Sequence, residues 1–335
     1  MISENVSLKS LNTFGIEVST KRFAKFSTIE ELSSILANRN NDALLVLGGG
    51  SNILFTKDFN GLVIKNEIKG FEILYENEDE VYVKVGGGVV WHSFVLECID
   101  KNFGGVENLS LIPGSVGASP MQNIGAYGTE IKDVFVDLEA YNIESGEIQT
   151  FDKDQCQFGY RESIFKKEFK DQYIIISVTY RLTKSHRINS SYGAIKAELE
   201  QKGISRPKIR DVSNAVIAIR SSRLPDPSEI GNAGSFFKNP IVNESKITQL
   251  KEQFESFPHY PAPNGKTKLA AGWLIEQAGW KGKTFETYGV HKNQALVLVN
   301  YGGCKGGDIL DLSTQIIADV EAKFGVVLER EVNII

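Results

Sequence analysis

The stretch between residues 231 and 240 contains residue types that could place a reactive hydroxyl group beside a bound substrate. It reads Gly231-Asn232-Ala233-Gly234-Ser235-Phe236-Phe237-Lys238-Asn239-Pro240. Glycines on either side of Ala233 let the backbone turn tightly and approach a ligand closely. The hydroxyl of Ser235 would then lie near a cation and an amide, Lys238 and Asn239. The alternative interpretation is a glycine-containing turn that leads into a buried Phe-Phe pair.

Strand-like runs that end in three glycines occur twice in the first part of the chain. Ala43–Leu47 precedes Gly48-Gly49-Gly50-Ser51-Asn52, and Val81–Val85 precedes Gly86-Gly87-Gly88. Backbone N–H groups in such loops bind anions, so the pair suits an extended ligand with a pyrophosphate. Ile53 stands where a dinucleotide fingerprint needs its third glycine, and no P-loop spacing is present. Plain tight turns are the alternative for both loops.

A longer loop, residues 113–128, is rich in glycine, hydroxyl and amide side chains. This composition suits a backbone that wraps a flat heterocycle with polar edges, although a long surface loop is the alternative. The chain has no C-x-x-C motif, and its four histidines, His92, His186, His259 and His291, show no metal or triad spacing. Redox chemistry would therefore require a bound cofactor.

The pattern of apolar residues predicts the elements that carry these loops. Thr28 caps a helix that contains Glu31, and a second helix runs from about Trp91 to Ile99. Residues 134–182 read mostly as strands, with a hairpin that turns at residues 144–146 and a long strand from Tyr173 to Tyr180.

After about residue 200 helix patterns dominate. We expect one helix capped by Asn243 and another capped by Asp308 that ends at Gly325. A final strand from Val326 to Val332 follows. Because strands and helices do not alternate strictly, the sequence favours an α+β protein over a doubly wound sheet.

Composition limits the class of protein. A net charge of −5 gives no basic surface for bulk binding of nucleic acid. The N-terminus lacks a secretory signal, and no apolar run reaches the roughly 18 residues of a membrane span, so we expect a cytoplasmic protein. The scattered cysteines Cys98, Cys156 and Cys304 are predicted to be structural thiols, and no metal site is expected.

These motifs together resemble the UDP-N-acetylenolpyruvoylglucosamine reductase (UDP-N-acetylmuramate dehydrogenase) family from about residue 11 onward. Besides the stretches at 48–52 and 231–240, the resemblance rests on several further motifs. They are Ile112-Pro113-Gly114-Ser115-Val116-Gly117, Gln122-Asn123-Ile124-Gly125-Ala126-Tyr127-Gly128, Tyr160-Arg161-Glu162-Ser163, Leu269-Ala270-Ala271-Gly272-Trp273-Leu274-Ile275 and His291-Lys292-Asn293-Gln294-Ala295-Leu296. Tyr192-Gly193 resembles the family's longer subtype, whose extra segment folds over the substrate.

The resemblance implies two FAD-binding α+β subdomains of the vanillyl-alcohol-oxidase type and a C-terminal α+β substrate-binding domain. We expect boundaries at 1–69, 70–205 and 206–325, with residues 326–335 returning as a strand to the FAD-binding region. The implied enzyme is an oxidoreductase with non-covalent FAD and NADPH as co-substrate. It acts in peptidoglycan precursor synthesis, and hence in cell wall biogenesis, cell shape and cell division. A monomer that binds neither nucleic acid nor membrane is expected.

The family reaction implies a role for distant residues. Hydride passes from flavin N5 to C3 of the enolpyruvyl group, and Ser235 would protonate C2. Arg161 and Glu331 would stabilise the enolate on the substrate carboxylate, with Glu331 protonated or sharing a proton. Alone, Arg161 reads as a surface ion-pair partner, and Glu331 as part of a half-exposed strand.

Binding residues also follow from the resemblance. Those expected to bind FAD are Gly48, Gly49, Gly50, Ser51, Asn52, Pro113, Gly114, Ser115, Val116, Gly117, Ser119, Asn123, Gly125, Tyr127 and Arg220. Those expected to bind the UDP-sugar are Tyr192, Arg223, Lys238, Asn239, Tyr260, Lys268 and Gln294. The family often has lysine at the position of Arg223, and the two side chains serve phosphate with different geometry.

Two other functions fit some of the same residues. One is an oxidase of the same fold that passes electrons to oxygen, a class that commonly tethers FAD through His or Cys. The other is a non-redox protein that binds or transfers a nucleotide sugar, in which the glycine loops would hold the UDP-sugar alone. In that case the Gly/Asn loop at 113–128 would have no ligand.

The colour of the purified protein separates these possibilities. For the reductase we expect yellow protein that NADPH bleaches and that the enolpyruvyl substrate reoxidises, because the cofactor carries the redox chemistry. A visible spectrum before and after denaturation is the measurement. Colour that stays with the denatured chain would support the oxidase, and colourless protein that binds no FAD would support the nucleotide-sugar protein.

Overall fold

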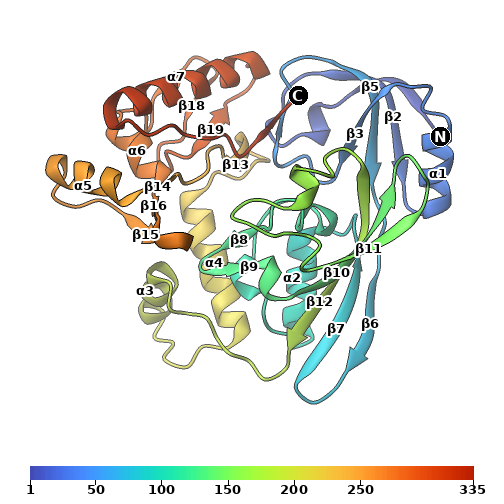
Figure 1. The fold of residues 1–335 in the computed structure, drawn as a ribbon, viewed down its shortest axis with the longest axis horizontal. Helices are drawn as coiled ribbons and strands as arrows, with labels where there is room; N and C mark the ends of the chain where they lie inside the picture. Colours follow the sequence, from blue (N-terminus) through green and yellow to red (C-terminus); the bar gives the residue numbers. More distant parts are fainter. The chain divides into compact units, whose positions relative to one another are not determined.

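The computed structural model describes all residues from 1 to 335, and the chain divides into two compact units. Unit one consists of Met1–Val6, Thr20–Gly50 and Asn60–Ser222, and unit two of Ser7–Ser19, Ser51–Phe59 and Arg223–Ile335. Figure 1 labels the helices and strands of both units. The mixture of helices and mainly antiparallel sheets confirms the α+β class. The expected boundaries at residues 69, 205 and 325 stay predictions.

The first sheet of unit one is a platform for the first glycine loop. In spatial order its strands are β1 (Ser3–Ser7), β2 (Ser19–Phe26), β5 (Phe59–Asn66) and β3 (Ala43–Leu47). Helix α1 (Ile29–Ala37) begins as predicted after Thr28, whose hydroxyl accepts a hydrogen bond of 3.2 Å from the Glu31 N–H. Leu32 and Ile35 of α1 pack on Leu62 and Ile64 of the sheet, which fixes the strand that enters Gly48.

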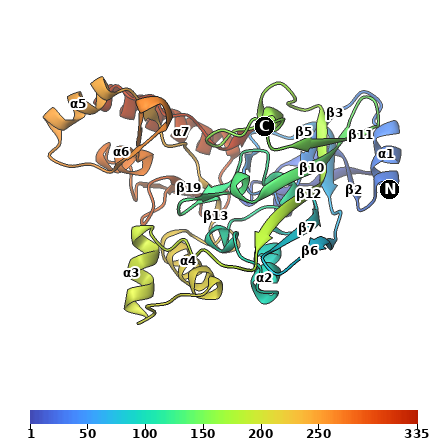
Figure 2. The ribbon, with the colours of Figure 1, turned by 60° about the horizontal axis from the view of Figure 1, so that its bottom comes forward.

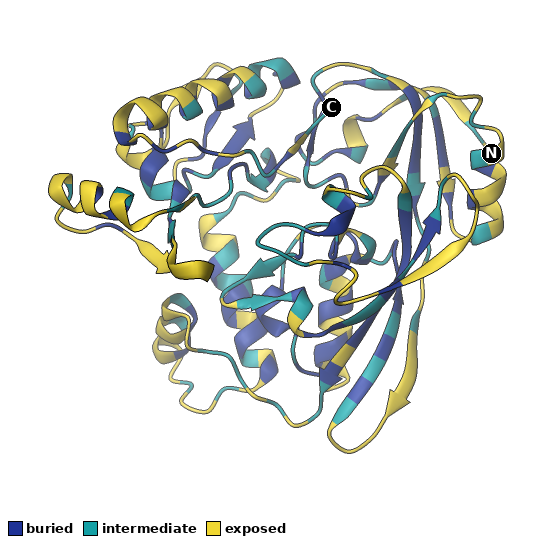
Figure 3. Cartoon of the chain, viewed as in Figure 1, coloured by how far each residue is buried: buried dark blue, intermediate teal, exposed yellow.

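The second sheet of unit one is antiparallel. Its strands, in spatial order, are β11 (Ile148–Asp152), β10 (Phe135–Asn142), β12 (Tyr173–Thr183), β7 (Glu80–Gly86) and β6 (Phe71–Glu76). The predicted hairpin is confirmed, because Tyr141 of β10 is paired with Ile148 of β11. At the other edge, β6 is exposed along most of its length (Figure 3). Its pairing register with β7 shifts between Ile73 and Tyr75.

Helices cover parts of unit one. Helix α2 (Trp91–Asp100) confirms the predicted helix and buries Trp91, Phe94 and Val95 in the same core as Val83 and Val178 of the second sheet. Helices α3 (Gly193–Gln201) and α4 (Ile209–Arg223) lie side by side in Figure 2 and share a small apolar cluster around Leu199 and Val216. A short hairpin, β8 (Gly125–Ala126) and β9 (Thr129–Glu130), belongs to the long loop after residue 113.

Unit two contains a four-stranded and a three-stranded sheet. The first has the order β13 (Gly231–Ser235), β19 (Val297–Asn300), β18 (Tyr288–Val290) and β17 (Thr284–Phe285). The second has the order β14 (Ile241–Val242), β16 (Thr267–Leu269) and β15 (His259–Pro261). The helices are α5 (Glu244–Gln253), α6 (Ala271–Gln277) and α7 (Gly306–Phe324), and α7 packs on α6, β18 and β19.

The C-terminal segment differs from the expected strand. Residues 326–332 form no regular strand, and only β20 (Asn333–Ile334) does, in parallel with β4 (Ile53–Leu54). Two isolated backbone hydrogen bonds hold the segment instead, because Glu331 N–H donates to Phe236 O and Lys238 N–H donates to Glu329 O. The predicted strand over residues 326–332 is therefore wrong, because this segment pairs over too few residues to count as a strand.

Helix α7 begins earlier than predicted. Lys305, not Asp308, is the N-cap residue. The Asp308 carboxylate instead accepts a hydrogen bond of 2.7 Å from the Lys305 N–H, in the manner of a capping-box residue one turn inside the helix. The predicted end is confirmed, since Gly325 has the left-handed backbone conformation (φ 60°) of a helix stop.

Two expectations about the whole chain can be compared with these elements. None of the helices combines the length and the apolar character that crossing a bilayer requires. The three cysteines are buried and form no disulfide, and burial raises the pKa of each thiol, that of Cys156 and Cys304 to about 12. Buried, protonated thiols agree with the structural role predicted for them.

Two neighbouring glycines at the start of α7 provide a matched test of packing. A Cβ atom on Gly306 would lie 1.7 Å from Phe55 O, whereas one on Gly307 would meet no atom within 4 Å. We expect Gly306→Ala to lower the free energy of unfolding by about 1–3 kcal/mol through overpacking. Gly307→Ala should instead raise it by roughly 0.5–1 kcal/mol, because alanine favours a helix. Urea unfolding checks both, and equal effects of the two substitutions would contradict the packing.

Candidate active site

Two glycine loops touch each other in unit one. A Cβ atom on Gly48 would lie 2.4 Å from Ser115 Oγ, and one on Gly49 would lie 2.8 Å from Gly114 Cα. Any larger residue at Gly49 would therefore separate the two loops. This paired backbone, the glycine cradle, contains N–H groups of the kind that bind phosphate.

The second triple glycine has a different role from the first. A Cβ atom on Gly86 would lie 2.6 Å from Ile68 O, and one on Gly87 would lie 2.6 Å from Ile175 O. One on Gly88 would lie 2.6 Å from Glu67 Cα. These glycines let neighbouring backbone segments pack, so the structure favours the plain-turn alternative for this loop.

The loop around Gly114 is tied to the start of α2. The Trp91 N–H donates to Gly114 O over 3.0 Å, and the Val116 N–H donates to Val89 O over 2.9 Å. Ser115 and Val116 are buried, while Pro113 is exposed. Ser119 is also buried, and its hydroxyl lies 2.8 Å from the hydroxyl of Tyr180. The backbone of this predicted FAD loop is thus fixed by the protein itself.

Arg220 of α4 places a cation beside the same loop. Its Nε donates to Leu111 O over 3.2 Å. Burial lowers the pKa of Arg220, and a hydrogen bond with Tyr127 opposes this shift. A partly buried guanidinium group suits an anionic ligand such as a diphosphate. The glycine cradle and this cation together fit the phosphate chemistry of FAD.

Arg161 lies at the top of a tight turn in unit one. Residues 159 and 162 form a bridge, and Arg161 has a left-handed backbone (φ 56°). Its Nη2 donates to Gly125 O over 2.7 Å, and a Cβ atom on Gly125 would lie 3.3 Å from its Nη1. Asn123 is fully buried and donates to Gly159 O over 3.1 Å, so it joins the 123–128 loop to the Arg161 turn.

Tyr127 and Tyr192 also meet in unit one. Their ring centroids are 5.3 Å apart in an edge-to-face arrangement. Tyr192 is exposed at the start of α3, and Tyr127 has a left-handed backbone (φ 49°). Unusual backbone conformations of non-glycine residues often cluster at functional sites. Asn123, Tyr127 and Arg161 form such a cluster in the predicted site.

In unit two, the Ser235 turn is held by the side chain of Asn232. This buried amide donates to Ile230 O over 2.8 Å and accepts from the Gly234 N–H over 2.9 Å. Gly234 has a left-handed backbone (φ 67°), as the sequence interpretation of this glycine required. Phe236 and Phe237 are buried, as the alternative interpretation of this stretch expected.

Glu331 is brought next to the Ser235 turn by backbone pairing. The Glu331 N–H donates to Phe236 O over 2.8 Å, and Phe237 and Arg330 form an antiparallel bridge. The Arg330 side chain donates to Ser313 Oγ of α7 over 2.7 Å. Because side chains alternate along extended backbone, Glu331 points away from this helix. Asn52, on the other side, donates to Glu331 O over 3.4 Å.

The remaining predicted substrate residues lie in unit two, apart from Tyr192. Tyr260 and Lys268 are direct cross-strand partners, so their side chains share one face of the three-stranded sheet. The Lys238 ammonium pairs with the exposed Glu329 carboxylate.

Asn239 and Gln294 also contact backbone. Asn239 Oδ1 accepts from the Ala271 N–H over 2.9 Å, and Gln294 Oε1 accepts from the Leu296 N–H over 3.3 Å. Arg223 is exposed at the end of α4.

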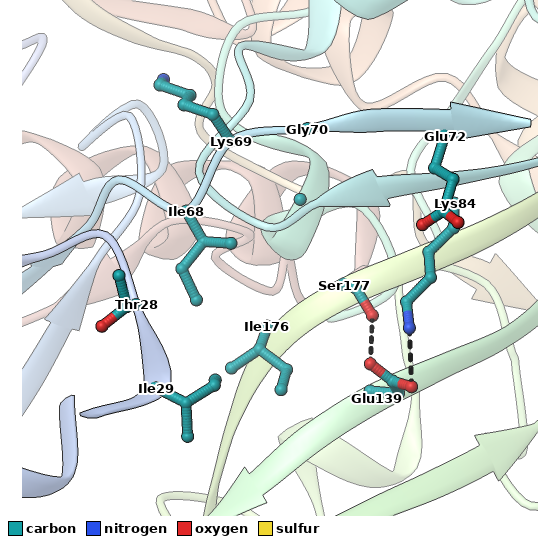
Figure 4. Close-up of a pocket in the computed structure, with 11 residues that line it drawn as sticks. Thr28, Ile29, Ile68, Lys69, Gly70, Glu72, Lys84, Glu139, Ile176 and Ser177 are labelled. Carbon is teal, nitrogen blue, oxygen red and sulfur yellow. Dashed lines mark hydrogen bonds and ion pairs between the residues drawn. The ribbon is translucent and has the colours of Figure 1, made fainter. Parts of the chain in front are cut away.

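A separate pocket of about 240 Å³ in unit one is lined by none of the residues expected to bind FAD, bind the UDP-sugar or take part in catalysis. Figure 4 shows Ile29, Ile68 and Ile176 on one side and Glu139 held between Ser177 and Lys84 on the other. Burial acts to raise the pKa of Glu139, but hydrogen bonds from Lys84 and Ser177 outweigh it and lower the pKa. No group of His, Cys, Asp or Glu side chains in the chain could hold a metal ion.

Family profiles match both parts of this architecture. Residues 20–152 match an FAD binding domain, and residues 226–335 match the C-terminal domain of UDP-N-acetylenolpyruvoylglucosamine reductase. With the glycine cradle and the partly buried cation of Arg220, these matches define an FAD-binding oxidoreductase of α+β fold.

Relatives identify the family. The chain is 56% identical to a UDP-N-acetylenolpyruvoylglucosamine reductase of Flavobacterium johnsoniae, over 100% of this chain and 99% of the relative. It is 50% identical to that of Amoebophilus asiaticus over 100% and 99% of the two chains, and 45% identical to that of Pseudomonas aeruginosa over 99% and 98%. The chain belongs to the UDP-N-acetylenolpyruvoylglucosamine reductase family.

A solved structure agrees on the fold. The reductase of Thermus caldophilus aligns with 100% of this chain and 99% of its own, with a TM-score of 0.70 at 22% identity. The family resemblance and the fold class predicted from the sequence are thereby confirmed.

His92 lies beside the predicted FAD loop, although the sequence showed only that it lacks metal or triad spacing. Its Nδ1 accepts a hydrogen bond of 3.0 Å from the Leu111 N–H. The two residues are 19 positions apart. The sequence also indicated that His92 lies just inside the predicted helix that begins at Trp91. That position does not reveal Leu111 as its hydrogen-bond partner.

The contact between the two glycine loops gives a direct test of the cradle. Gly49→Ala would push its Cβ into the Gly114 backbone, which cannot move aside as a flexible side chain would. We expect FAD affinity to fall at least about tenfold, a change of roughly 1.4 kcal/mol. Titration of the FAD-free protein with FAD is the measurement, and Gly307→Ala is the control. Unchanged affinity in Gly49→Ala would show that the loops need not touch to hold FAD.

Proposed function

We propose that this chain, an NADPH-dependent reductase of its family, reduces UDP-N-acetylglucosamine enolpyruvate with Ser235, Glu331 and Arg161 as its catalytic side chains. The product is UDP-N-acetylmuramate, a precursor of peptidoglycan. Identity over the full chain to reductases of this name supports the activity. The observation that carries the assignment of Ser235 and Glu331 is the backbone pairing that joins their segments.

FAD, reduced by NADPH, supplies the hydride that is added to C3 of the enolpyruvyl group. The proposed FAD residues in unit one are Gly48–Gly50, Pro113–Gly117, Ser119, Asn123, Gly125, Tyr127 and Arg220, with Ser51 and Asn52 following in unit two. The close contact of Gly49 with Gly114 and the partly buried Arg220 support this set. Ser119 and Asn123 are bound to other protein groups, so their role is to shape the loops.

The chain stabilises charge and delivers a proton. Arg161 offers guanidinium N–H groups to the substrate carboxylate, where negative charge develops as an enolate. Glu331, protonated or sharing a proton, donates a hydrogen bond to the same charge. The Ser235 hydroxyl protonates C2, which requires a fixed position and, because serine alone is a poor acid, neighbours that polarise the hydroxyl. The Asn232 side chain, which closes the turn, supports that fixed position.

The UDP-sugar is proposed to contact Tyr192, Arg223, Lys238, Asn239, Tyr260, Lys268 and Gln294. The cross-strand pair of Tyr260 and Lys268 offers an aromatic face and a cation side by side, which suits a nucleoside diphosphate. Tyr192 belongs to the segment that resembles the longer subtype of the family.

The remaining assignments are also proposals. They are the division at residues 69, 205 and 325, a cytoplasmic location, a monomeric state, and roles in cell shape and cell division. Sedimentation of the FAD-loaded protein tests the monomer, since a mass twice that of the chain's 37.1 kDa would contradict it.

The activity is tested by following NADPH absorbance. FAD-loaded protein should oxidise NADPH steadily only when UDP-N-acetylglucosamine enolpyruvate is present. Equally fast oxidation with oxygen alone would overturn the assignment as a reductase.

Loss of the Ser235 hydroxyl separates the two halves of the reaction. We expect Ser235→Ala to bind FAD and accept hydride from NADPH normally, but to transfer it to substrate about 10²–10⁴-fold more slowly, because a positioned proton donor is lost. Stopped-flow absorbance of the flavin measures each half. Ser228→Ala, which removes an exposed hydroxyl bonded to Asp226, is the control. Reoxidation at the normal rate in Ser235→Ala would remove this serine from the mechanism.

A further inference from the structure

The backbone of Leu111 is held at both of its polar groups just before the predicted FAD loop. Its N–H donates to His92 Nδ1 over 3.0 Å, and its carbonyl oxygen accepts from Arg220 Nε over 3.2 Å. His92 lies on α2 and Arg220 on α4, so two helices fix the two peptide groups that flank this residue. Leu111 also has a left-handed backbone (φ 58°), which a non-glycine residue adopts only where its surroundings enforce it.

The residues around His92 hold the same stretch of chain. Trp91 Nε1 donates to Leu109 O over 2.9 Å, and the Trp91 N–H donates to Gly114 O over 3.0 Å. Ser110 is tied to Ser213 of α4, with 2.8 Å between the hydroxyl oxygens. The start of α2 therefore holds residues 109, 111 and 114, and His92 provides the side-chain acceptor for the backbone N–H of Leu111.

We propose that His92 is a positioning residue for FAD, acting through the Leu111 peptide to hold the Pro113–Gly117 loop in its binding conformation. This inference rests on the proposed contact of that loop with FAD. The bond requires a neutral imidazole with its proton on Nε2, because Nδ1 must offer a lone pair to a backbone N–H. A protonated ring would turn an N–H group toward the Leu111 N–H, and the bond would be lost.

The surroundings keep this imidazole neutral. Burial lowers the pKa of His92, and the positive charge of Arg220 lowers it further. Arg220 is the charged group that faces the ring, and Tyr127 and Arg161 face Arg220 in turn. Since the loop-holding form is the neutral one, FAD affinity should be complete above the ordinary histidine pKa of about 6.5. It should decrease as the pH falls below that value through the lowered pKa.

Two substitutions at His92 separate positioning from general stability. His92→Asn keeps an acceptor oxygen at the place of Nδ1 but does not titrate. His92→Leu keeps similar bulk and leaves the Leu111 N–H without an acceptor. The control is His186→Asn, whose imidazole contacts Asn102 O on a different loop. FAD is removed from each protein and added back at pH values from about 5.5 to 8, the range in which histidine titrates, with binding followed by flavin fluorescence.

We expect His92→Leu to raise the dissociation constant for FAD roughly tenfold at neutral pH, as the loss of an acceptor for a buried N–H implies. His92→Asn should bind FAD within about threefold of the wild type at neutral pH and should not lose affinity as the pH falls, since an acceptor remains and cannot be protonated. His186→Asn should follow the wild type throughout.

Two results would overturn the proposal. One is wild-type affinity for FAD in His92→Leu; if the FAD-free variant also melts at a lower temperature, the residue is merely structural. The other is the same acid-dependent loss of affinity in His92→Asn as in the wild type. If the wild-type protein binds no FAD at neutral pH, the assignment of FAD as cofactor is itself wrong. This result is obtained before any variant is compared.

Discussion

The hydrogen bond from the Glu331 N–H to Phe236 O is the contact on which the site in unit two depends. It joins two segments that are 95 residues apart in the sequence. Strands β14 to β19 and helices α5, α6 and α7 all lie between them along the chain. Without it, Ser235 would end a short strand and Glu331 would lie in an irregular tail. The buried side chains of Phe236 and Phe237 fix one partner, and the bonds of Arg330 to α7 fix the other.

In unit one, glycines allow backbone segments to pack directly against each other, because no side chains lie between them. Gly48 and Gly49 allow one loop to touch another, while Gly86, Gly87 and Gly88 allow backbone segments to pack behind them. The same motif therefore lets two different sets of segments pack within one unit. Around Gly48 and Gly49 the space is filled by Ser115 Oγ and the Gly114 backbone, and around Gly86, Gly87 and Gly88 by carbonyl oxygens and backbone atoms.

Much of this fold could be predicted from local patterns. The Thr28 cap, the Trp91 helix, the hairpin after Tyr141 and the Gly325 stop follow from propensities that act within a few residues. Local patterns did not identify the N-cap of α7, which is Lys305 and not the nearby Asp308. They also predicted a strand at residues 326–332, where only two backbone hydrogen bonds form.

The site was predictable only in part. Residue types and the family resemblance suggested Ser235, Arg161 and Glu331, but the contacts that hold them could not be read from the chain. The bond between Asn123 and Gly159 and the bond between His92 and Leu111 join side chains to backbone far away in sequence. Such bonds leave no periodic pattern, because any polar side chain of the right length could make them.

The pairing of β4 with β20 has a consequence for the order in which the chain can fold during synthesis. Thr56 and Ile335, which share a hydrogen bond at the end of this pair, are 279 positions apart. Residues 7–19 and 51–59 leave the ribosome early, yet their partners in unit two begin only at residue 223. These early segments cannot complete their contacts with the rest of unit two until residues 223–335 have been synthesised. Non-local contacts of this kind slow folding, so unit two is the part most exposed to chaperones and proteases while the polypeptide is being made.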